Sequence, residues 1–463
     1  MQYSTVDYQS IVDASHSLRF DAEFFRPDYL AIRRRLEAIG SRKLIDFQVN
    51  IRHPKEIKRN YVENGVLLLR GQNVRPLSID LTANPVYISE EDAERLKENT
   101  IHYKDILIMR SGANVGQCAI YLENNPAISM SDTLIIRSRN LNPFFLTIFL
   151  NTKYGEALVE RGKYGSAQPH IAPAFLYQIP VPSWEDLQTK IEKAYLRSKE
   201  LMELSKTRYA ETQTLLLSEL GLADWQPKHR LAFATDYASM QRAERIDADY
   251  FQPRYDDIIS AIKSYPGGWG TVANQVHLKD SNFKPKPETE YKYIELADIG
   301  SSGEIKDCMV AQGQDLPSRA RCKVNTGDVI ASSVEGSLES IALVTEEYDN
   351  ALCSTGFHAI HSDVLNSETL LVFLKSSVGQ LQLKKGCSGT ILTAINREEF
   401  SRIVIPFITT DKQYEIRQKV VESFNLRKHA KDLLECAKRA VEIAIEQDEQ
   451  TAIGWLESVL WVP

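Results

Sequence analysis

The sequence predicts an α+β protein made of two similar halves, each of which ends in a long helix. Three observations lead to this prediction. A motif near the N-terminus returns in the second half of the chain, short runs of β-branched and aromatic residues recur in both halves, and a long helical pattern free of Gly and Pro closes each half. Together these observations indicate a duplicated architecture.

The repeat opens with RFDAEFFRPDY at residues 19–29, which returns as RIDADYFQPRY at residues 245–255, a shift of 226 residues from Asp21 to Asp247. The end of the unit, GSAQPHIAPAFLYQIPVP, returns as GTILTAINREEFSRIVIP, a shift of 224 residues from Gly165 to Gly389. Because the two shifts nearly agree, we infer duplicated units of about 225 residues rather than one chance match.

Each half begins with mixed strand and helix signals, up to Pro182 in the first half and Pro406 in the second. Runs such as VLLLRG, DILIMRSG and DTLIIRSR in the first half, and DVIASS, SIALVT and FHAIHS in the second, are broken by Gly, Asn and Asp, which is typical of short strands. A helix is expected over residues 27–39, since Pro27 suits the first helical position.

Helical periodicity then replaces the strand signals. Long helices are predicted over residues 184–220 and 411–447, each opened by a capping box, one from Ser183 to Asp186 and one from Thr410 to Gln413. Each would be roughly 50 Å long at 1.5 Å per residue. A narrow apolar seam favours coiled-coil pairing, with a helical hairpin or an oligomerisation stalk as alternatives. The seam residues are Ile191, Tyr195, Met202, Tyr209, Leu216, Ile416, Val420, Phe424, Leu434, Ala437 and Val441.

These patterns predict the domain boundaries. We expect a first α+β domain over residues 1–183 and a first spacer helix over 184–220. A linker with the second α+β domain follows over 221–407, then a second spacer helix over 408–447 and a tail over 448–463. A Trp-bearing segment follows each helix, so we expect the tail to pack near the N-terminus and the molecule to have pseudo-twofold symmetry.

Composition narrows the class of protein. The chain has 463 residues, with 55 Lys and Arg against 62 Asp and Glu, so its net charge of −7 does not by itself indicate a nucleic-acid binder. Six scattered cysteines show no zinc-site spacing and predict reduced thiols. No apolar run reaches the ~20 residues that a membrane span requires, and the N-terminus has no signal-peptide pattern, so we expect a cytoplasmic protein without membrane contact.

Two similar heads joined through paired helices suit a ligand that offers two separated sites, and duplex DNA is the candidate. Reading base edges requires Arg or Lys for guanine, Asn or Gln for adenine, and Ser or Thr for either. Three loops of the first half carry such side chains, namely Arg70, Gln72 and Asn73; Arg110, Ser111 and Asn114; and Lys163, Tyr164, Ser166, Gln168 and His170. In the second half the corresponding candidates are Arg319, Arg321, Ser332, Ser333, Lys384, Lys385, Ser388 and Thr390.

The repeated opening motif, the glycine turns GSxQ and GTxL, the exits IPVP and IVIP and the following long helices resemble the specificity subunit of Type I restriction-modification systems. The resemblance covers nearly the whole chain in both copies. It implies two target recognition domains, each reading half of a bipartite DNA sequence, separated by two long helices in an antiparallel coiled coil. The first copy has Gln168 and Pro169 where the second has Leu392. Recognition domains are expected to diverge where they meet bases, so this difference leaves the recognised bases open and does not affect the resemblance to the family.

The resemblance also implies partners and the absence of bound cofactors. Two methyltransferase subunits are expected to dock on the chain, and restriction or translocase subunits could join them. S-adenosylmethionine, ATP and Mg²⁺ would be held by those partners, so the chain itself is expected to be non-catalytic and to bind no metal.

Two other interpretations stay open. The chain could be a non-catalytic coiled-coil scaffold of a phage-defence complex, or an enzyme with a metal site on the repeated carboxylates of Asp21, Glu23, Asp247 and Asp249. No nucleotide-binding GxGxxG or GK(S/T) string and no Asn-Pro-Pro-Tyr type methyltransferase motif supports catalysis. The recurrence of these carboxylates beside arginine favours an ion pair or a capping device.

Overall fold

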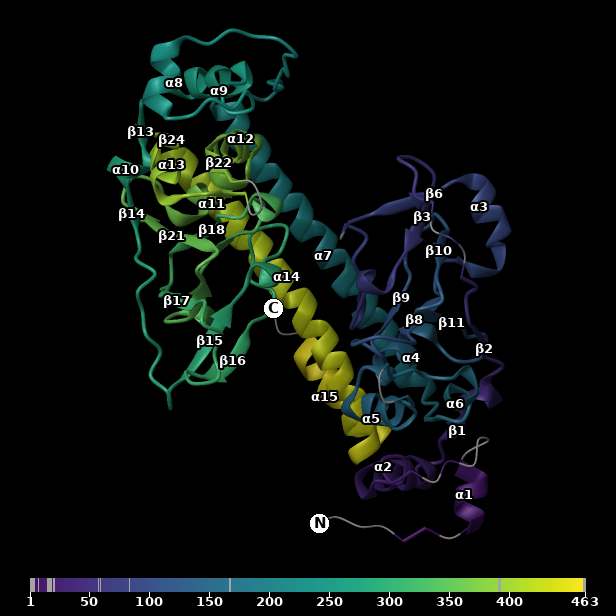
Figure 1. Cartoon of the computed structure of the whole chain (residues 1–463). Helices are drawn as coiled ribbons and strands as arrows, with labels where there is room; N and C mark the ends of the chain where they lie inside the picture. The colour runs from purple at the N-terminus through teal and green to yellow at the C-terminus, as the bar shows by residue number, and fades with distance from the viewer. Residues whose placement is uncertain are drawn as a thin grey trace. The chain divides into compact units, whose positions relative to one another are not determined.

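The computed structural model describes residues 5–460, apart from 7, 15–18, 20, 57, 59, 83, 166–167 and 390–392. The chain divides into two compact units, Met1–Leu201 with Lys428–Pro463, and Met202–Arg427. Strands and helices alternate in both, which confirms the predicted mixed α and β content (Figure 1). Each unit contains one α+β domain and part of each of the two long helices, α7 (Glu185–Glu219) and α14 (Thr410–Glu446).

Two four-stranded sheets form the framework of the first unit. Their strand orders are β6-β3-β10-β7 and β2-β11-β8-β9, and β3 runs parallel to β10 while the other pairs are antiparallel. The strands are β2 (Asn50–Arg52), β3 (Val66–Leu69), β6 (Val86–Ile88), β7 (Thr100–Ile101), β8 (Ile106–Met109), β9 (Cys118–Ile120), β10 (Ala127–Ser129) and β11 (Thr133–Arg137), with the small pairs β1 (Arg42–Lys43) with β12 (Pro180–Val181) and β4 (Val74–Arg75) with β5 (Ser78–Ile79).

The second unit has the same strand orders, β16-β15-β20-β17 and β14-β21-β18-β19, and its one parallel pair, β15 with β20, occupies the place of β3 with β10. The strands are β14 (Val276–Leu278), β15 (Glu290–Ile294), β16 (Met309–Gln312), β17 (Ala320–Lys323), β18 (Val329–Ser332), β19 (Ile341–Leu343), β20 (Leu352–Ser354) and β21 (Phe357–Ser362), with the small pairs β13 (Trp269–Thr271) with β24 (Val404–Pro406) and β22 (Cys387–Ser388) with β23 (Ala394–Ile395).

Helices cover the sheets of each unit. In the first unit α4 is buried nearly all round, because it lies between a sheet and the start of α7 in one continuous apolar core. The first unit contains α1 (Tyr8–Ala14), α2 (Pro27–Ala38), α3 (Glu90–Arg95), α4 (Pro143–Leu150), α5 (Lys153–Arg161), α6 (Pro173–Leu176) and α15 (Glu449–Leu460); the second contains α8 (Tyr237–Ala243), α9 (Pro253–Lys263), α10 (Val272–Gln275), α11 (Ser367–Lys375), α12 (Ser377–Gly386) and α13 (Arg397–Ser401). The helix predicted from Pro27 is therefore confirmed as α2.

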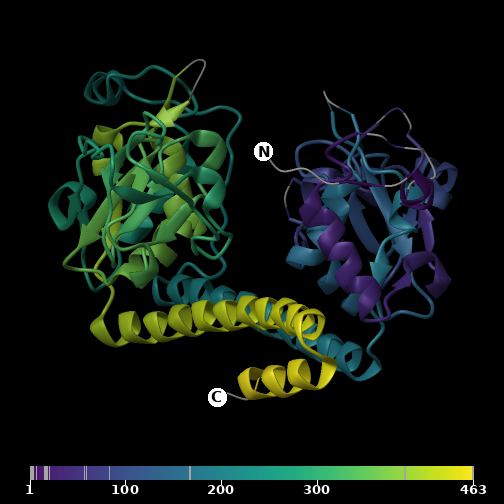
Figure 2. The same ribbon diagram turned by 90° about the horizontal axis from the view of Figure 1, so that it is seen from below.

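The two long helices pack against each other within each unit, as the predicted seam requires (Figure 2). In the second unit Arg208 binds Glu422 and Glu211 binds Lys419, so residue numbers rise along one helix and fall along the other. This antiparallel contact fits a coiled coil. All predicted seam residues are buried or half-buried.

Small hydroxyl side chains lie in the seam where only apolar ones were predicted. The Ser205 hydroxyl donates to the Ser423 carbonyl at 2.8 Å, and the Ser423 hydroxyl donates to the Ser205 carbonyl at 2.8 Å. In the first unit Ser198 donates to the Ala430 carbonyl at 2.7 Å. These contacts require close approach of the two backbones, which only short side chains permit.

The predicted capping box from Thr410 to Gln413 is wrong. Thr410 is already helical, and the Gln413 side chain accepts from the Asn366 amide at 2.7 Å and donates to the Val364 and Ile408 carbonyls. Its role is to join α14 to the second α+β domain. Gln188 of α7 makes the matching contact in the first unit by accepting from the Asn142 amide at 2.9 Å.

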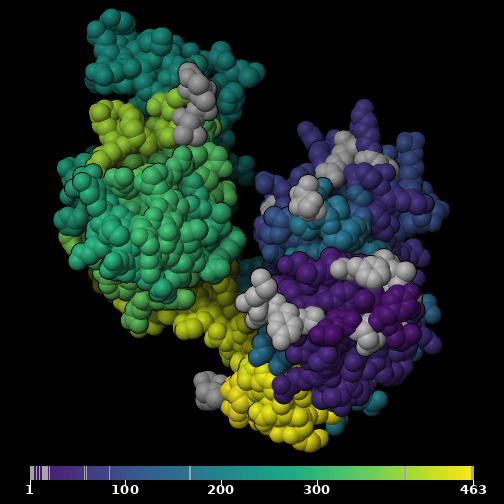
Figure 3. Space-filling model, turned by 60° about the horizontal axis from the view of Figure 1, so that its bottom comes forward, coloured from purple at the N-terminus to yellow at the C-terminus, as the bar shows by residue number. Residues whose placement is uncertain are grey.

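The segments around α15 and α8 differ in their packing. Helix α15 turns back after α14 (Figure 2), and its Glu449 and Glu457 side chains bind the Leu187 amide and the Lys190 ammonium of α7. The segment around α8 stands out from the rest of the second unit (Figure 3), and most of its side chains are exposed. Among the described residues, no helix is long and apolar enough to span a membrane.

The six cysteines are free thiols.

Candidate nucleic-acid interface

Two of the predicted loops of the first unit meet at the same edge of a sheet. Strand β8 ends at Met109, which pairs with Thr133 at the start of β11, so Arg110 and Asp132 face each other just beyond the ladder. The Asp132 carbonyl accepts from the Arg110 amide at 2.8 Å and from the Ser111 amide at 3.3 Å. Its carboxylate accepts from the Gly71 amide at 2.8 Å, which brings in the loop of the 3-10 turn η2 (Gly71–Asn73).

The third predicted loop joins the same edge. Tyr164 and His170 exchange two backbone hydrogen bonds, at 3.0 and 2.9 Å, and so close a small hairpin. His170 forms an isolated bridge with Ser111, and the Ile171 amide donates to the Arg110 carbonyl at 3.0 Å. The three loops predicted from the sequence therefore lie together, and Arg110 is held by backbone contacts from two directions.

The side chains of these loops fall into two groups. Asn73 is 3% exposed and closes its own turn, because its amide accepts from the Arg70 amide and donates to the Asp80 carbonyl. Lys163 is paired with Glu160. The others are exposed or half-exposed at the loop surface, namely Arg70, Gln72, Arg110, Ser111, Asn114, Tyr164, Gln168 and His170. Ser166 lies outside the described residues.

Several polar atoms of this edge are enclosed but have no hydrogen-bond partner among the described residues. They are Nε of Arg70, Nε of Arg110, Oδ1 of Asp132 and Nδ1 of His170. An enclosed polar atom without a partner costs roughly 1–3 kcal/mol. These atoms retain hydrogen-bonding capacity at this edge, as do other enclosed polar atoms elsewhere in both units.

The second unit repeats this backbone framework. Strand β18 ends at Ser332, which pairs with Phe357 at the start of β21, so Ser333 and Gly356 occupy the places of Arg110 and Asp132. The Ser333 amide donates to the Gly356 carbonyl at 2.8 Å, and the Ile395 amide donates to the Ser333 carbonyl at 2.8 Å. Two backbone hydrogen bonds of the first unit thus recur in the second, although neither side chain is retained.

The polar candidates of the second unit are more dispersed. Ser332 is buried and bonds Ser337 and Val334, while the Ser333 hydroxyl donates to the Gly356 carbonyl at 2.9 Å. Arg319 and Arg321 lie instead near the start of β17 and are exposed, and the Arg321 Nε donates only to the Ser318 carbonyl at 3.0 Å. Arg319 nevertheless borders the edge formed by Ser333, because its carbonyl accepts from the Thr355 amide at 3.0 Å, one residue before Gly356.

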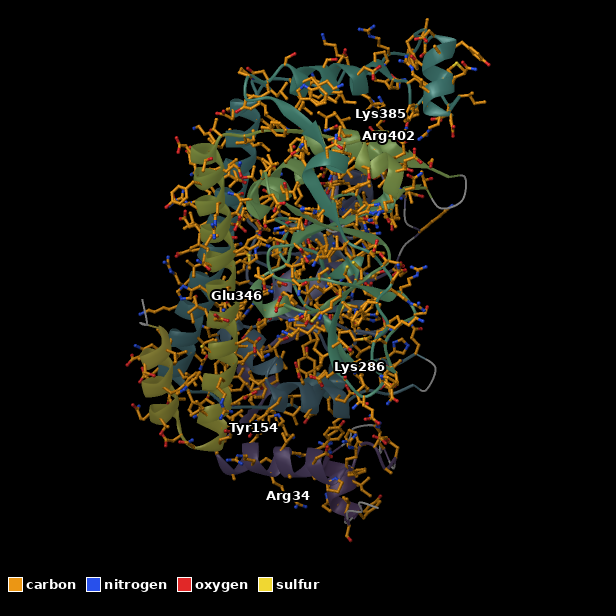
Figure 4. The ribbon with its side chains drawn as sticks, turned by 90° about the vertical axis from the view of Figure 1, so that its left-hand side faces the viewer. Arg34, Tyr154, Lys286, Glu346, Lys385 and Arg402 are labelled. Atoms are coloured by element: carbon orange, nitrogen blue, oxygen red, sulfur yellow. The ribbon has the colours of Figure 1, made fainter. Side chains whose placement is uncertain are left out.

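The paired lysines lie on the last turn of α12 and not in a loop. Lys384 is paired with Glu335, and Lys385 with Asp256 at 3.0 Å. The Lys385 ammonium also lies 5.1 Å from the centre of the Tyr250 ring. Lys385 thus contacts the opening motif of the second repeat through Tyr250, whereas Lys384 binds Glu335 outside that motif. Figure 4 labels Lys385 and Arg402, both of the second unit. Ser388 is exposed in β22, and Thr390 lies outside the described residues.

The repeated carboxylates pair with the arginines of their own opening motifs. Arg19 binds Asp21 and Arg245 binds Asp247, both at 2.7 Å, and the hydrogen bond from each arginine lowers the pKa of its aspartate. Asp21 also accepts from the Phe24 amide at 3.0 Å, and Asp247 from the Tyr250 amide at 3.1 Å. These contacts agree with the interpretation of an ion pair that caps a turn.

Sequence reasoning missed Asp132 and Gly356. Both stand one residue before a strand, where an Asp or a Gly ordinarily signals a turn. Only the register of the ladder shows that they face Arg110 and Ser333. The run DTLIIRSR, which begins at Asp132, was interpreted only as a strand signal.

The fold and this site define a class of protein with two α+β units of equal strand order and paired long helices. No family model and no curated protein matches the chain. Among solved structures, it is similar to the Type-I restriction-modification system S subunit from M. genitalium, with 12% identity and a TM-score of 0.40 over 90% of this chain and 95% of that one.

It is also similar to the HsdS subunit from Thermoanaerobacter tengcongensis, with 15% identity and a TM-score of 0.27 over 86% of this chain and 94% of that one. A third likeness is to a structure of the type I R-M system, with 16% identity and a TM-score of 0.27 over 77% and 82% of the two chains. Two of these three structures are described as the kind of subunit that the sequence resembles. Because every TM-score is below 0.5, no residue's role is transferred from these structures.

Proposed function

We propose that the chain is the DNA sequence-specificity subunit of a Type I restriction-modification system. Each α+β domain reads one half of a bipartite duplex target, and the chain itself is non-catalytic. The observation that carries this proposal is the sheet edge of the first unit, where three loops rich in base-reading side chains meet around Arg110, Ser111 and Asp132. The same backbone framework recurs at Ser333 and Gly356 with different side chains, as expected of two readers of different sequences.

The remaining roles follow from this proposal. The long helices serve as the spacer between half-sites and as a docking surface for two methyltransferase subunits, which bind S-adenosylmethionine. Restriction subunits, where present, supply the ATP- and Mg²⁺-dependent steps. The pseudo-twofold symmetry and the cytoplasmic location expected from the sequence belong to the same proposal.

The decisive experiment compares the methylated sequence motifs in genomic DNA from cells with and without the chain, read by single-molecule sequencing. We expect deletion of its gene to abolish adenine methylation of one bipartite motif and complementation to restore it. Unchanged methylation would contradict the proposal and favour the coiled-coil scaffold.

A segment exchange tests the modular part of the proposal. Residues 245–405, which lie inside the second unit, are replaced by the equivalent segment of another specificity subunit. Only one half of the methylated motif should change, because the first unit keeps its own loops. Simultaneous change of both halves would show that the units do not read independently.

A further inference from the structure

The two units carry chemically different side chains on the same backbone framework. Directly after β8 the first unit has Arg110, and directly after the equivalent strand β18 the second unit has Ser333. Directly before β11 the first unit has Asp132, and directly before the equivalent strand β21 the second unit has Gly356. At the residue before the 3-10 turn, Arg70 is replaced by Glu295, and both receive the same side-chain cap, from Asn73 in one case and from Asp298 in the other.

Arg110 differs from a structural arginine of the same sheet. Arg137 on β11 binds both carboxylate oxygens of Asp105, with its nearest contact at 2.9 Å, and also donates to the Thr100 carbonyl. Arg110 has no such ion pair or side-chain hydrogen bond to any residue that the structure describes. Only its Nε is enclosed, so the two terminal nitrogens of the guanidinium remain at the surface.

The backbone of Arg110 is nevertheless firmly placed. Its amide donates to the Asp132 carbonyl and its carbonyl accepts from Ile171, while the Asp132 carboxylate holds the neighbouring loop through the Gly71 amide. A fixed backbone carrying an unpaired guanidinium loses little conformational entropy when it binds, which suits the planar, bidentate recognition of a guanine edge.

We propose that Arg110 reads a guanine in the half-site of the first unit, through its O6 and N7 atoms, and that Asp132 is the positioning residue that presents Arg110. The second unit makes no such contact, because the Ser333 hydroxyl is turned back onto the Gly356 carbonyl at 2.9 Å. This inference rests on the proposed function and adds the base and the residue that reads it.

The test uses the complex with its methyltransferase subunits and a set of duplexes in which each base of the methylated motif is substituted singly. Arg110→Lys keeps the positive charge but loses the planar fork. We expect it to reduce discrimination for guanine at one position of one half-site roughly 5- to 150-fold, the range of one bidentate contact. Ser333→Ala is the matched control and should leave that position unchanged.

Asp132 is tested by two substitutions. Asp132→Asn keeps an oxygen that can accept from Gly71 and should retain guanine discrimination. Asp132→Ala keeps the backbone carbonyl that accepts from Arg110 but releases the Gly71 loop beside it, and should reduce that discrimination. If Asp132 acts as a positioning residue, Asp132→Asn should restore the base preference of the parent complex as well as its thermal stability. Loss of stability in Asp132→Ala with unchanged preference would overturn this part of the proposal.

The outcomes separate the inference from the function on which it rests. A parent complex that discriminates among none of the duplexes contradicts the proposed function. A parent complex that selects a bipartite motif, together with Arg110→Lys and Arg110→Ala variants that keep its preference at every position, overturns the role of Arg110 and leaves the proposed function intact.

Discussion

Arg427 shows at the scale of a single residue how the second unit joins its domain to its helices. Its side chain is 8% exposed, pairs with Glu304, and donates to the Ser302 hydroxyl at 2.9 Å. Its Nε also lies 3.4 Å from the Ser205 hydroxyl on α7. One guanidinium therefore links α14, α7 and the loop before β16. A buried charge of this kind is far more costly to leave unpaired than to replace together with its partner.

Removing Arg427 alone should therefore be severe. Arg427→Ala leaves Glu304 enclosed without its counter-charge, and we expect a loss of roughly 3–5 kcal/mol in the stability of the second unit. Hydrogen exchange of peptides from residues 202–427 measures this loss. The control is Lys206→Ala, which removes an exposed pair with Glu203 and should cost less than about 1 kcal/mol. Equal effects of the two variants would show that the buried pair contributes no more than a surface pair.

Glu446 makes the first unit sensitive to acid. Burial alone would raise the pKa of Glu446, but hydrogen bonds from Lys153, Arg439 and Tyr154 outweigh it and lower the pKa to about 2. Figure 4 labels Tyr154, which belongs to α5 and donates to this carboxylate on the last turn of α14. The folded-state pKa lies below the ordinary value of 4.5, so this stabilisation is complete above about pH 4.5 and is lost as the pH falls toward 2.

Glu446→Gln should consequently flatten the acid limb of the stability curve. We expect a loss of roughly 2 kcal/mol at neutral pH, where three donors lose their charged acceptor, and a difference from the parent that shrinks toward pH 2. Urea unfolding at a series of pH values measures both. A difference that is the same at pH 7 and pH 2.5 would contradict the assigned pKa.

The roles of individual residues were harder to predict from the sequence than the helices and strands. The sequence suggested Asn73, Lys384 and Lys385 as ligand contacts because their chemistry suits DNA, but each is occupied inside its own unit. Asp132, which organises the site, gave no more signal than a turn residue. Pairing between residues far apart in the chain decides these roles, and no local pattern encodes it.

At the scale of elements, the long helices were predicted almost to the residue, because helical periodicity and the absence of Gly and Pro are local signals. The strands were predicted as short runs, but the parallel pairing of β3 with β10 was not, since register depends on contacts across the sheet. The hydroxyls in the helix seam also escaped prediction, because Ser within a helix ordinarily indicates its solvated face.

The seam hydroxyls allow a test of helix packing. Ser205→Ala should cost about 1 kcal/mol by removing its hydrogen bond to the Ser423 carbonyl. Ser205→Leu should cost more, roughly 1–3 kcal/mol or above, because a larger side chain must push the two backbones apart. Thermal unfolding compares them with Ser218→Ala, an exposed serine of the same helix expected to change stability by less than about 0.5 kcal/mol. A Leu variant as stable as the Ala variant would refute the close approach.

At the scale of the whole molecule, the net charge of the chain affects how strongly it binds DNA, which is a polyanion. Its net charge is −7, and many of its cations already pair with carboxylates inside each unit. Arg319 and Arg321 are exposed and form no ion pair among the described residues, so they are available for phosphates. The isolated chain should therefore bind duplex DNA weakly, with few phosphate contacts, while the assembled complex draws further cations from its partners.

The dependence of DNA affinity on salt concentration measures how many phosphates the chain and the complex each neutralise. The logarithm of the binding constant falls with the logarithm of salt concentration by about 0.9 for each neutralised phosphate, so the complex should show a steeper slope than the isolated chain. Replacing both Arg319 and Arg321 by Ala should reduce the slope of the complex by up to about 2 and weaken binding to all sequences alike. Lys412→Ala, which removes a cation already paired with Glu415 at 3.0 Å, should leave the slope unchanged. If the arginine variant keeps the parent slope, these two side chains do not contact the phosphate backbone.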